Sequence, residues 1–180
     1  MKSETQIINE LIDREGGYSN NPKDPGKATM WGWTEKNARR LGYKGRMQDL
    51  PRSTAFQWYL DKYWIGTGFK RVSELSIPVA IELLDSGVNV GSRRVVKWLQ
   101  RSLNVLNAEE RLYKDLKPDG AIGDKTIGVL QEYLDYRGAN GVTVMLRCLN
   151  SWQGVHYMTL AEKKESYEEF EFGWFLNRVD

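Results

Sequence analysis

The sequence of 180 residues is short of the side chains on which many catalytic and metal sites depend. It contains one cysteine, Cys148, and one histidine, His156. A single cysteine excludes an internal disulfide framework, and a single histidine is too few for a histidine metal cluster or a Ser-His-Asp triad. We therefore expect no metal and no cofactor, and we expect any catalysis to come from carboxylates, tyrosines, lysines or hydroxyls.

Long apolar runs are also lacking. The N-terminal stretch MKSETQIINELIDREGG has no apolar segment of the length that a signal peptide or a membrane-spanning helix needs. We expect synthesis in the cytoplasm without a signal peptide, and no insertion into a membrane. With 41% hydrophobic and 28% charged residues, the composition is typical of a soluble globular protein of one domain or two closely packed lobes.

The net charge of +2 is unevenly distributed. Residues 161–172 carry five glutamates and two lysines, so the rest of the chain is more basic than the total suggests. Arg94, Lys97 and Arg101 recur on one face of a predicted helix. A solvated helix face is the simplest interpretation of these cations. The functional alternative is that they bind an anionic polymer of the cell envelope, and binding of nucleic acid ranks after that.

Helical periodicity dominates the chain, and the first helix is the clearest. Ser3 and Gln6 form a capping-box pattern that predicts a helix from Glu4 to Glu15, ended by glycines. Residues 27–34 alternate, which predicts a short strand with Thr29, Trp31 and Trp33 on one side. The fold class is therefore mainly α, with one small β-hairpin near the N-terminus.

The remaining apolar patterns predict six further helices. The first is capped by Thr34 and ends at Gly42, the second is capped by Ser53 and reaches Trp64, and the third starts at Pro78. The others are a helix over 95–106, a helix with Asp124 as its N-cap, and a long helix over 142–171 with a kink at Gly154.

Glu15 is the first candidate for chemistry. It follows Ile8 and Leu11 at helical spacing and lies in the last turn of the predicted helix, where the helix dipole is negative. Partial burial and nearby carbonyls both favour the protonated carboxylic acid, the form that a general acid needs. Asp24 follows in a proline-bounded turn, and two carboxyls in unlike surroundings suit glycosidic bond cleavage. A frayed Glu15 and an ordinary turn residue at Asp24 are the structural alternatives.

The stretch after this helix carries the most specific pattern: Glu15-Gly16-Gly17-Tyr18, Asn21-Pro22, Asp24-Pro25-Gly26, Ala28-Thr29 and Gly32. It resembles the signature of glycoside hydrolase family 108, a group of phage endolysins and bacterial muramidases with a lysozyme-like fold. Tyr59, Tyr63-Trp64 and Asp85 with Val88-Asn89-Val90-Gly91 follow in the family's order. Residues 98–101, 119–123 and 174–179 resemble its peptidoglycan-binding region, so the likeness covers nearly the whole chain.

The resemblance implies a lysozyme-like catalytic region at 1–91 and a helical peptidoglycan-binding-like region at 92–180, packed with the first as one compact unit. It implies that Glu15 is the catalytic acid. The spacing of Asp24 and Thr29 is similar to the Glu, Asp, Thr set of phage-type lysozymes, with one residue fewer between Asp and Thr. Lys27, Met30 and Trp33 depart from the pattern and place bulk beside this site.

The implied activity is that of an N-acetylmuramidase that cleaves the MurNAc-β-1,4-GlcNAc bond. A lytic transglycosylase at the same bond and a non-catalytic wall-binding protein are the alternatives. The expected partner is peptidoglycan rather than nucleic acid, reached in the periplasm or cell wall. The resemblance suggests release through a holin, and an accessory route or a role in cell entry is equally compatible with the sequence. The protein is expected to be a monomer.

Four residues are candidates for binding the sugar: Trp31, Tyr63, Asp85 and Asn89. Trp31 could line a subsite from the strand face it shares with Thr29, or could simply pack over the hairpin. Asp85 and Asn89 stand four apart on one helix face, where they could hydrogen-bond sugar hydroxyls or tie the fold together as a buried pair.

Overall fold

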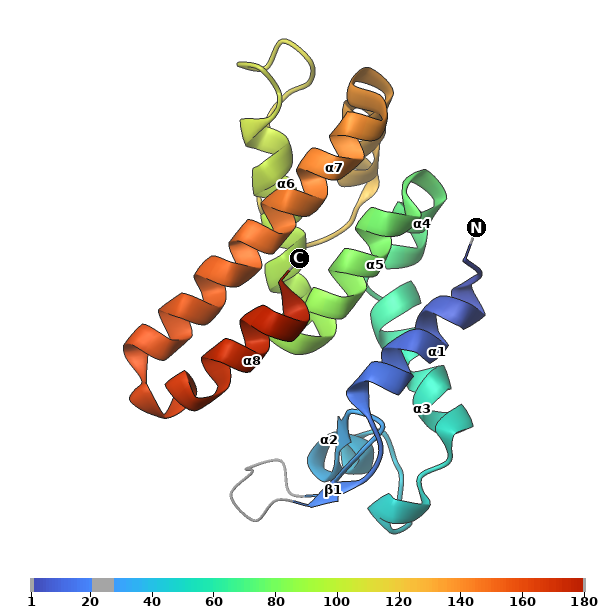
Figure 1. Ribbon diagram of the computed structural model, residues 1–180. Helices are drawn as coiled ribbons and strands as arrows, with labels where there is room; N and C mark the ends of the chain where they lie inside the picture. The colour runs from blue at the N-terminus through green and yellow to red at the C-terminus, as the bar shows by residue number, and fades with distance from the viewer. Residues whose placement is uncertain (1, 21–27, 180) are drawn as a thin grey trace. The chain divides into compact units, whose positions relative to one another are not determined.

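The computed structural model describes residues 2–20 and 28–179, and the chain divides into two compact units, 1–62 and 63–180. Helices make up most of both units, and the described strands form one small antiparallel sheet near the N-terminus, so the predicted fold class is confirmed. Figure 1 shows the helices in chain order. The compact units divide the chain at a different position from the regions predicted from motifs, 1–91 and 92–180, which stay a prediction.

The first unit contains these elements: α1 (Glu4–Glu15), β1 (Ser19–Asn20), β2 (Ala28–Met30), β3 (Trp33–Thr34), α2 (Glu35–Arg40), the 3-10 turn η1 (Met47–Asp49) and α3 (Arg52–Tyr59). A stretch of wider π-helical turns, η2 (Leu60–Ile65), continues from α3.

Helix α1 has the predicted bounds, and its ends explain them. The Ser3 hydroxyl accepts from the Gln6 amide at 3.2 Å, while the Gln6 side chain accepts from the Ser3 amide at 2.8 Å. At the other end Gly16 has φ 80, a conformation that favours glycine. The apolar face of α1 is buried and packs beside α3 (Figure 1). These contacts fix the position of the last turn, which carries Glu15.

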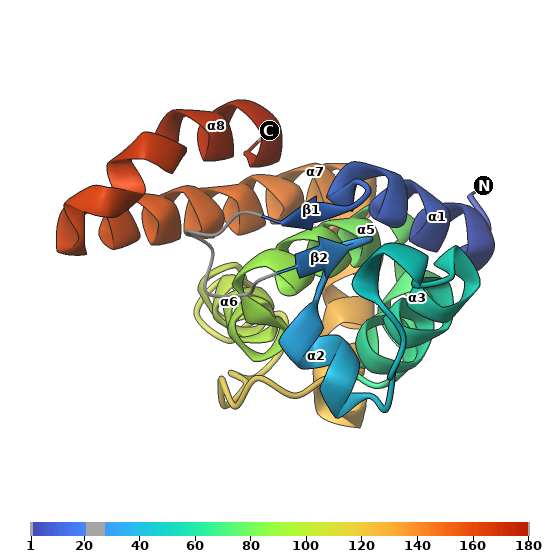
Figure 2. The same ribbon diagram turned by 90° about the horizontal axis from the view of Figure 1, so that it is seen from below.

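The sheet has the order β1-β2-β3 and differs from the predicted strand. Met30 pairs with Trp33, so Trp31 and Gly32 form a two-residue turn between β2 and β3, with φ 54 and φ 76. Positive φ at both positions is the requirement of the tight hairpin turn. The prediction that Trp31 lies on a strand face with Thr29 is therefore wrong. Figure 2 shows β1 and β2 next to each other.

The helix caps give a mixed result. The Thr34 hydroxyl accepts from the Asn37 amide at 3.4 Å, so the predicted cap of α2 is confirmed. Ser53 was predicted to cap the next helix, but α3 begins at Arg52 after Pro51, and Ser53 lies inside it. Pro51 holds the cap position in an extended conformation, with φ −63 and ψ 138, and no side-chain cap is formed there.

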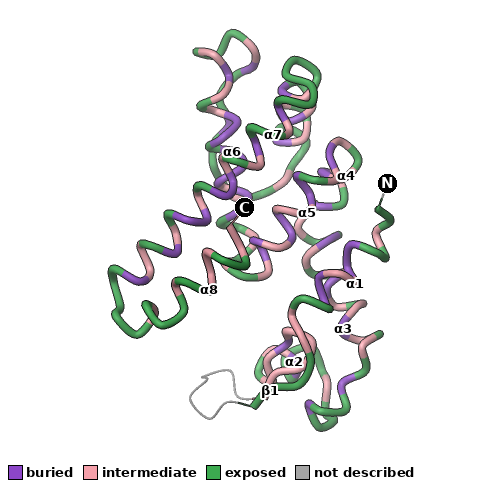
Figure 3. The backbone as a smooth tube through the Cα atoms, in the orientation of Figure 1, coloured by how far each residue is buried: buried purple, intermediate pink, exposed green. Residues whose placement is uncertain are grey.

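The second unit contains α4 (Phe69–Leu75), α5 (Ile77–Ser86), the π-helical stretch η3 (Gly87–Gly91), α6 (Ser92–Val105), α7 (Asp124–Lys163), the 3-10 turn η4 (Glu165–Tyr167) and α8 (Glu168–Arg178). Its core lies between α5, α6 and α7, whose buried positions appear purple in Figure 3. Within the described part of the chain, no helix is long and apolar enough to span a membrane.

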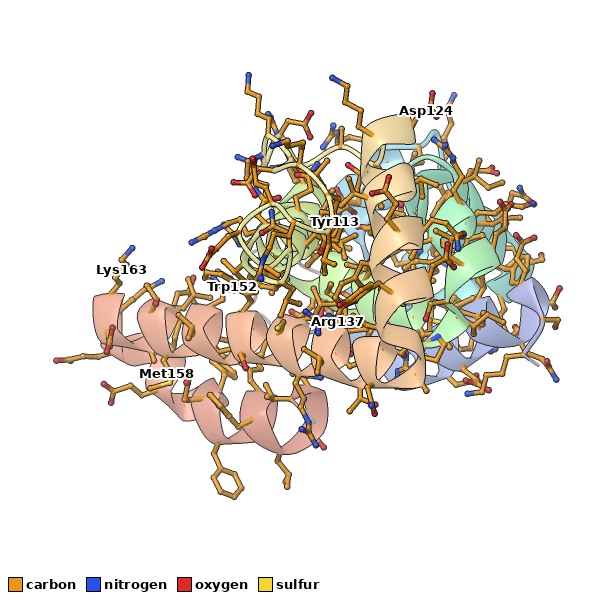
Figure 4. All side chains as sticks on the ribbon, turned by 90° about the horizontal axis from the view of Figure 1, so that it is seen from above. Tyr113, Asp124, Arg137, Trp152, Met158 and Lys163 are labelled. Atoms are coloured by element: carbon orange, nitrogen blue, oxygen red, sulfur yellow. The ribbon has the colours of Figure 1, made fainter. Side chains whose placement is uncertain are left out.

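Helix α7 corrects three predictions. The helix predicted over 142–171 is not continuous, because α7 ends at Lys163 and α8 begins at Glu168. Asp124 is the first residue of α7, and Gly123 holds the cap position. The helix breaks at Gly138, with φ 55 and ψ −144, rather than at Gly154, and Figure 4 shows it turning sharply near Arg137. Gly154 stays helical, and a β-carbon there would lie 3.4 Å from the Phe175 ring of α8, an ordinary contact distance.

Candidate active site

Glu15 lies at the junction between α1 and the sheet, against the β2–β3 turn. A β-carbon at Gly32 would stand 2.9 Å from Glu15 Oε2 and less than 3.0 Å from the Tyr59 hydroxyl. Side chain and turn backbone therefore meet with no space to spare. Glu15 is half-buried, and its carboxyl lies beside this backbone. It belongs to the last turn of α1, the end toward which the helix carbonyls point.

Tyr59 brings a buried hydroxyl to the same place. The residue is 1% exposed at the end of α3, and its hydroxyl donates to the carbonyl of Trp31 at 2.9 Å. Its ring packs against that of Trp33, with centroids 5.0 Å apart. The Tyr59 hydroxyl thus holds the Trp31–Gly32 turn in place, with Gly32 against Glu15.

Arg52 fixes the other side of the turn. Its guanidinium donates to Asp13 Oδ1 at 2.8 Å and to Asn9 Oδ1 at 3.0 Å, both on α1. The same guanidinium lies 5.6 Å from the centre of the Trp31 ring, whose Nε1 donates to the Leu50 carbonyl at 3.0 Å. Arg52 therefore links the start of α3, the end of α1 and the turn, which makes the surroundings of Glu15 rigid.

A group of aromatic side chains continues from Tyr59. Trp33 is 2% exposed and meets Trp58 edge to face at 5.2 Å. The Lys62 ammonium lies 5.0 Å from the Trp33 ring centre. Burial lowers the pKa of Lys62, and the positive charge of Arg40 adds to this effect. Trp33 was expected to place bulk beside the site; its ring is packed in the core of this unit instead.

Thr29 and Asp24 were predicted to assist Glu15, and only Thr29 lies among the described residues. Thr29 lies in the central strand, paired with Ser19 on one side and Thr34 on the other. Ser19 follows Glu15 by four residues, so the sheet brings Thr29 beside the segment that leaves the end of α1. Asp24 lies outside the described residues, as does Lys27.

The four candidates for sugar binding have different surroundings. Trp31 lies in the turn beside Glu15, with its indole nitrogen bonded to Leu50. Tyr63, Asp85 and Asn89 belong to the second unit. The Tyr63 carbonyl accepts from the Thr67 hydroxyl, Asp85 Oδ1 is 3.8 Å from Arg178 Nη1, and Asn89 Nδ2 donates to the Tyr157 hydroxyl at 2.8 Å.

The contacts of Asp85 and Asn89 agree with the structural alternative, a pair that ties helices together, because Tyr157 lies on α7 and Arg178 on α8. Their role in binding sugar stays a prediction, as does that of Tyr63. Sequence reasoning singled out neither the packing role of Gly32 nor that of Arg52. A glycine after a tryptophan between two alternating segments is the signal from which the hairpin turn could have been found.

The described residues contain no group of three or more His, Cys, Asp or Glu side chains that could hold a metal ion. In the described part of the first unit, the Glu15 carboxyl and the Tyr59 hydroxyl meet at the backbone of Gly32. Such a carboxyl can donate a proton to a leaving oxygen once a substrate is bound.

Comparison with known proteins identifies both halves of the chain. Residues 8–91 match the family model Glycosyl hydrolase 108, and residues 94–179 match the model Predicted Peptidoglycan domain. A solved structure described as "Structure of Brucella abortus SagA" is 24% identical, with a TM-score of 0.65, over 93% of this chain and 84% of that chain. At this identity it shows the fold alone. No curated protein matches the chain. The resemblance found in the sequence is thus confirmed: the two models match in the expected order, Glycosyl hydrolase 108 over residues 8–91 and the predicted peptidoglycan domain over residues 94–179.

Proposed function

We propose that the protein is a peptidoglycan hydrolase that cleaves the MurNAc-β-1,4-GlcNAc bond, with Glu15 as the general acid. The observation that carries the proposal is the position of the Glu15 carboxyl, held between the end of α1 and the backbone of Gly32, with the Tyr59 hydroxyl alongside. The two matching family models support a glycosidase that acts on peptidoglycan. The bond and the residue roles are our proposal.

In the proposed reaction Glu15 donates its proton to the glycosidic oxygen as the bond to the sugar carbon breaks. Positive charge develops on the ring as that bond breaks, and hydrolysis is completed when water adds to the same carbon and gives up a proton to a carboxylate. Asp24 and Thr29 are proposed to assist, by orienting that water or by opposing the ring charge. Tyr59 and Arg52 act indirectly, since they hold the turn that positions Glu15.

The test compares wild type with Glu15→Gln on purified peptidoglycan, with release of new reducing ends as the readout. Glutamine keeps the shape of the side chain but cannot donate the proton, so we expect a loss on the order of a hundredfold or more. Glu10→Gln is the matched control, because Glu10 lies on the same helix and pairs with Lys2 at 2.6 Å on the surface. The control is expected to keep near wild-type activity.

Circular dichroism establishes that both variants are folded. Full activity in folded Glu15→Gln would refute the assignment of the acid. Mass spectrometry of the products separates hydrolysis from transglycosylation, because an anhydro product is lighter by one water. A wild type that pellets with peptidoglycan and releases no products would instead be a wall-binding protein without catalytic activity.

A further inference from the structure

Helix α6 has a charge pattern that the proposed reaction does not use. It carries four cations, Arg93, Arg94, Lys97 and Arg101, and no acidic residue occurs anywhere from 86 to 108. Trp152 and His156 of α7, which contact Arg101 and Arg94 of α6, belong to a second acid-free stretch, 136–161. Neighbouring helix segments without a carboxylate create a region of positive potential.

Three of these cations, Arg93, Arg94 and Lys97, line a pocket at the start of α6. The pocket has a volume of about 490 Å³ and is lined by Val90, Gly91, Ser92, Arg93, Arg94 and Lys97. No side chain caps this end of α6. The loop at Gly120 packs against the same turn, because a β-carbon there would stand 2.5 Å from Arg93 Cγ and 3.3 Å from Lys97 Cγ. A hollow with three cations on its wall suits an anionic group.

Further along α6, contacts with α7 hold the polar side chains in place. Arg94 Nη1 lies 3.1 Å from His156 Nε2, and the Arg101 guanidinium stacks 4.0 Å above the Trp152 ring. Trp152 Nε1 in turn donates to the Ser102 hydroxyl at 3.2 Å. Figure 4 shows Trp152 where α7 passes beside α6. A stacked guanidinium is ordered before any ligand arrives, so less conformational entropy is lost on binding.

The cations are not neutralised by the described part of the protein. None of the four forms an ion pair with a carboxylate among residues 2–20 and 28–179. Asp119, an acidic residue of the loop that contacts Arg93, presents its backbone carbonyl to Arg93 Nε at 3.2 Å. Its carboxylate is used elsewhere, accepting from Gln100 and from the Ala121 amide at 2.9 Å each.

We propose that this pocket is an anion subsite of the peptidoglycan domain that binds the free carboxylates of peptidoglycan stem peptides. The inference rests on the proposed function, because the identity of the ligand follows from peptidoglycan as the substrate. A guanidinium matches a carboxylate with two parallel hydrogen bonds, and Lys97 adds a point charge at the pocket wall. Residues Arg94 and Lys97 fall within 94–179, the range of the matching peptidoglycan model.

The subsite would read the peptide part of the polymer while Glu15 acts on the sugar part. This predicts that the protein prefers peptidoglycan with intact stem peptides over the same polymer with its carboxyl groups blocked. Binding should also weaken as salt is raised, since the contact is charge-assisted and partly exposed.

The experiment measures pelleting of the full chain with two preparations of one peptidoglycan, untreated and amidated at its carboxyl groups. Lys97→Gln is expected to weaken binding to the untreated preparation about five- to tenfold, and Arg94→Gln/Lys97→Gln by more. The wild type is expected to bind untreated peptidoglycan more tightly than amidated peptidoglycan, and both variants should lose this preference. Arg111→Gln/Lys125→Gln is the matched control, because it also removes one arginine charge and one lysine charge from the surface. Arg111 donates to the Ala108 carbonyl as Arg94 donates to the Val90 carbonyl, so each double variant loses one such hydrogen bond.

The outcomes separate the subsite from the function. If the wild type binds both preparations equally and releases reducing ends, the subsite is refuted and the hydrolase stands. If it neither pellets nor releases products, the proposed function fails with the subsite. Displacement by duplex DNA, but not by soluble stem peptides, would also overturn the subsite. Thermal melts check folding; Lys97→Gln carries the test if Arg94→Gln, which loses a bond to Val90, does not fold.

Discussion

The carboxyl of Glu15 and the hydroxyl of Tyr59 approach one point beside Gly32, each less than 3.0 Å from where a β-carbon would stand. Position 32 can therefore hold a glycine and little else. The hydroxyl is committed to the Trp31 carbonyl, so the turn, the tyrosine and the proposed acid form one rigid group. Small changes here should move the carboxyl, and a displacement of about 1 Å can cost on the order of a hundredfold in rate.

Gly32→Ala should lower muramidase activity on the order of a hundredfold, because the new methyl group pushes against Glu15 and Tyr59. Gly42→Ala is the control: Gly42 has φ 88 and nothing within 4 Å of its missing β-carbon. Both variants bear the cost of a left-handed alanine, roughly 1–2 kcal/mol, so only crowding separates them. Equal activity in the two variants, measured as reducing-end release after a thermal melt, would show that the close approach does not matter.

Tyr59→Phe should act on the rate rather than on substrate affinity. Removing the hydroxyl loses the bond to the Trp31 carbonyl, about 1 kcal/mol of stability, and frees the turn that positions Glu15. We expect kcat to fall on the order of tenfold with little change in KM. Tyr43→Phe loses a comparable bond, to the Arg46 carbonyl at 3.1 Å, away from Glu15. If both variants lose stability and keep kcat, Tyr59 does not position the acid.

The parts of this unit that were predictable are those fixed by near neighbours in sequence. The capping box of α1 joins residues three apart, and so does the Thr34 cap, and both were predicted correctly. The turn at Trp31 was not, because bulky residues avoid positive φ. What holds it there is distant in the chain: Tyr59 and Leu50 bind the residue, and Arg52 covers its ring.

The same limit explains the error in α7. Gly138 and Gly154 look alike in sequence, and either could interrupt a helix. The break occurs at Gly138, which has φ 55, whereas Gly154 stays helical. The residues next to each glycine do not show which of the two leaves the helical conformation. The candidate site shows this too: Glu15 was singled out from its own helix, but the partner that crowds it comes from a turn.

Gln100 provides a third prediction, in the second unit. This side chain is 1% exposed, and its Nε2 lies within hydrogen-bonding distance of Asp119, Ala121 and Thr126, while its Oε1 accepts from the Gly120 amide at 2.9 Å. Gln100→Leu should cost about 2–4 kcal/mol in the free energy of unfolding, because it leaves buried polar groups of the loop without a partner. The loss should appear as a lower midpoint in urea.

The matched control is Gln131→Leu, which removes a single exposed bond to Asp135 at 2.7 Å and should change stability by less than about 0.5 kcal/mol. The Gly120 loop packs against Arg93 and Lys97, which line the proposed anion subsite, so Gln100→Leu should also reduce pelleting with untreated peptidoglycan. Equal urea midpoints for the two variants would mean that the loop does not depend on Gln100.

His156 makes stability depend on pH in a predictable direction. Burial lowers its pKa below the ordinary value of 6.5, and the charges of Arg94 and Lys163 lower it further. Arginine can only donate, so the Arg94 contact requires His156 Nε2 to accept, which needs a neutral ring. On acidification the unfolded chain takes up the proton first, so the folded state loses stability as pH falls below about 6.5.

His156→Gln should remove this loss, because glutamine can still accept from Arg94 and does not titrate. His156 is the only histidine in the chain, and the carboxylates titrate mainly at lower pH, so the window from pH 7 to 5.5 isolates its effect. We expect the urea midpoint of the wild type to fall across this window and that of His156→Gln to stay nearly level. Parallel curves would mean that His156 is accommodated as a cation, and that the positive potential along α6 is weaker than its sequence of four cations without an acid implies.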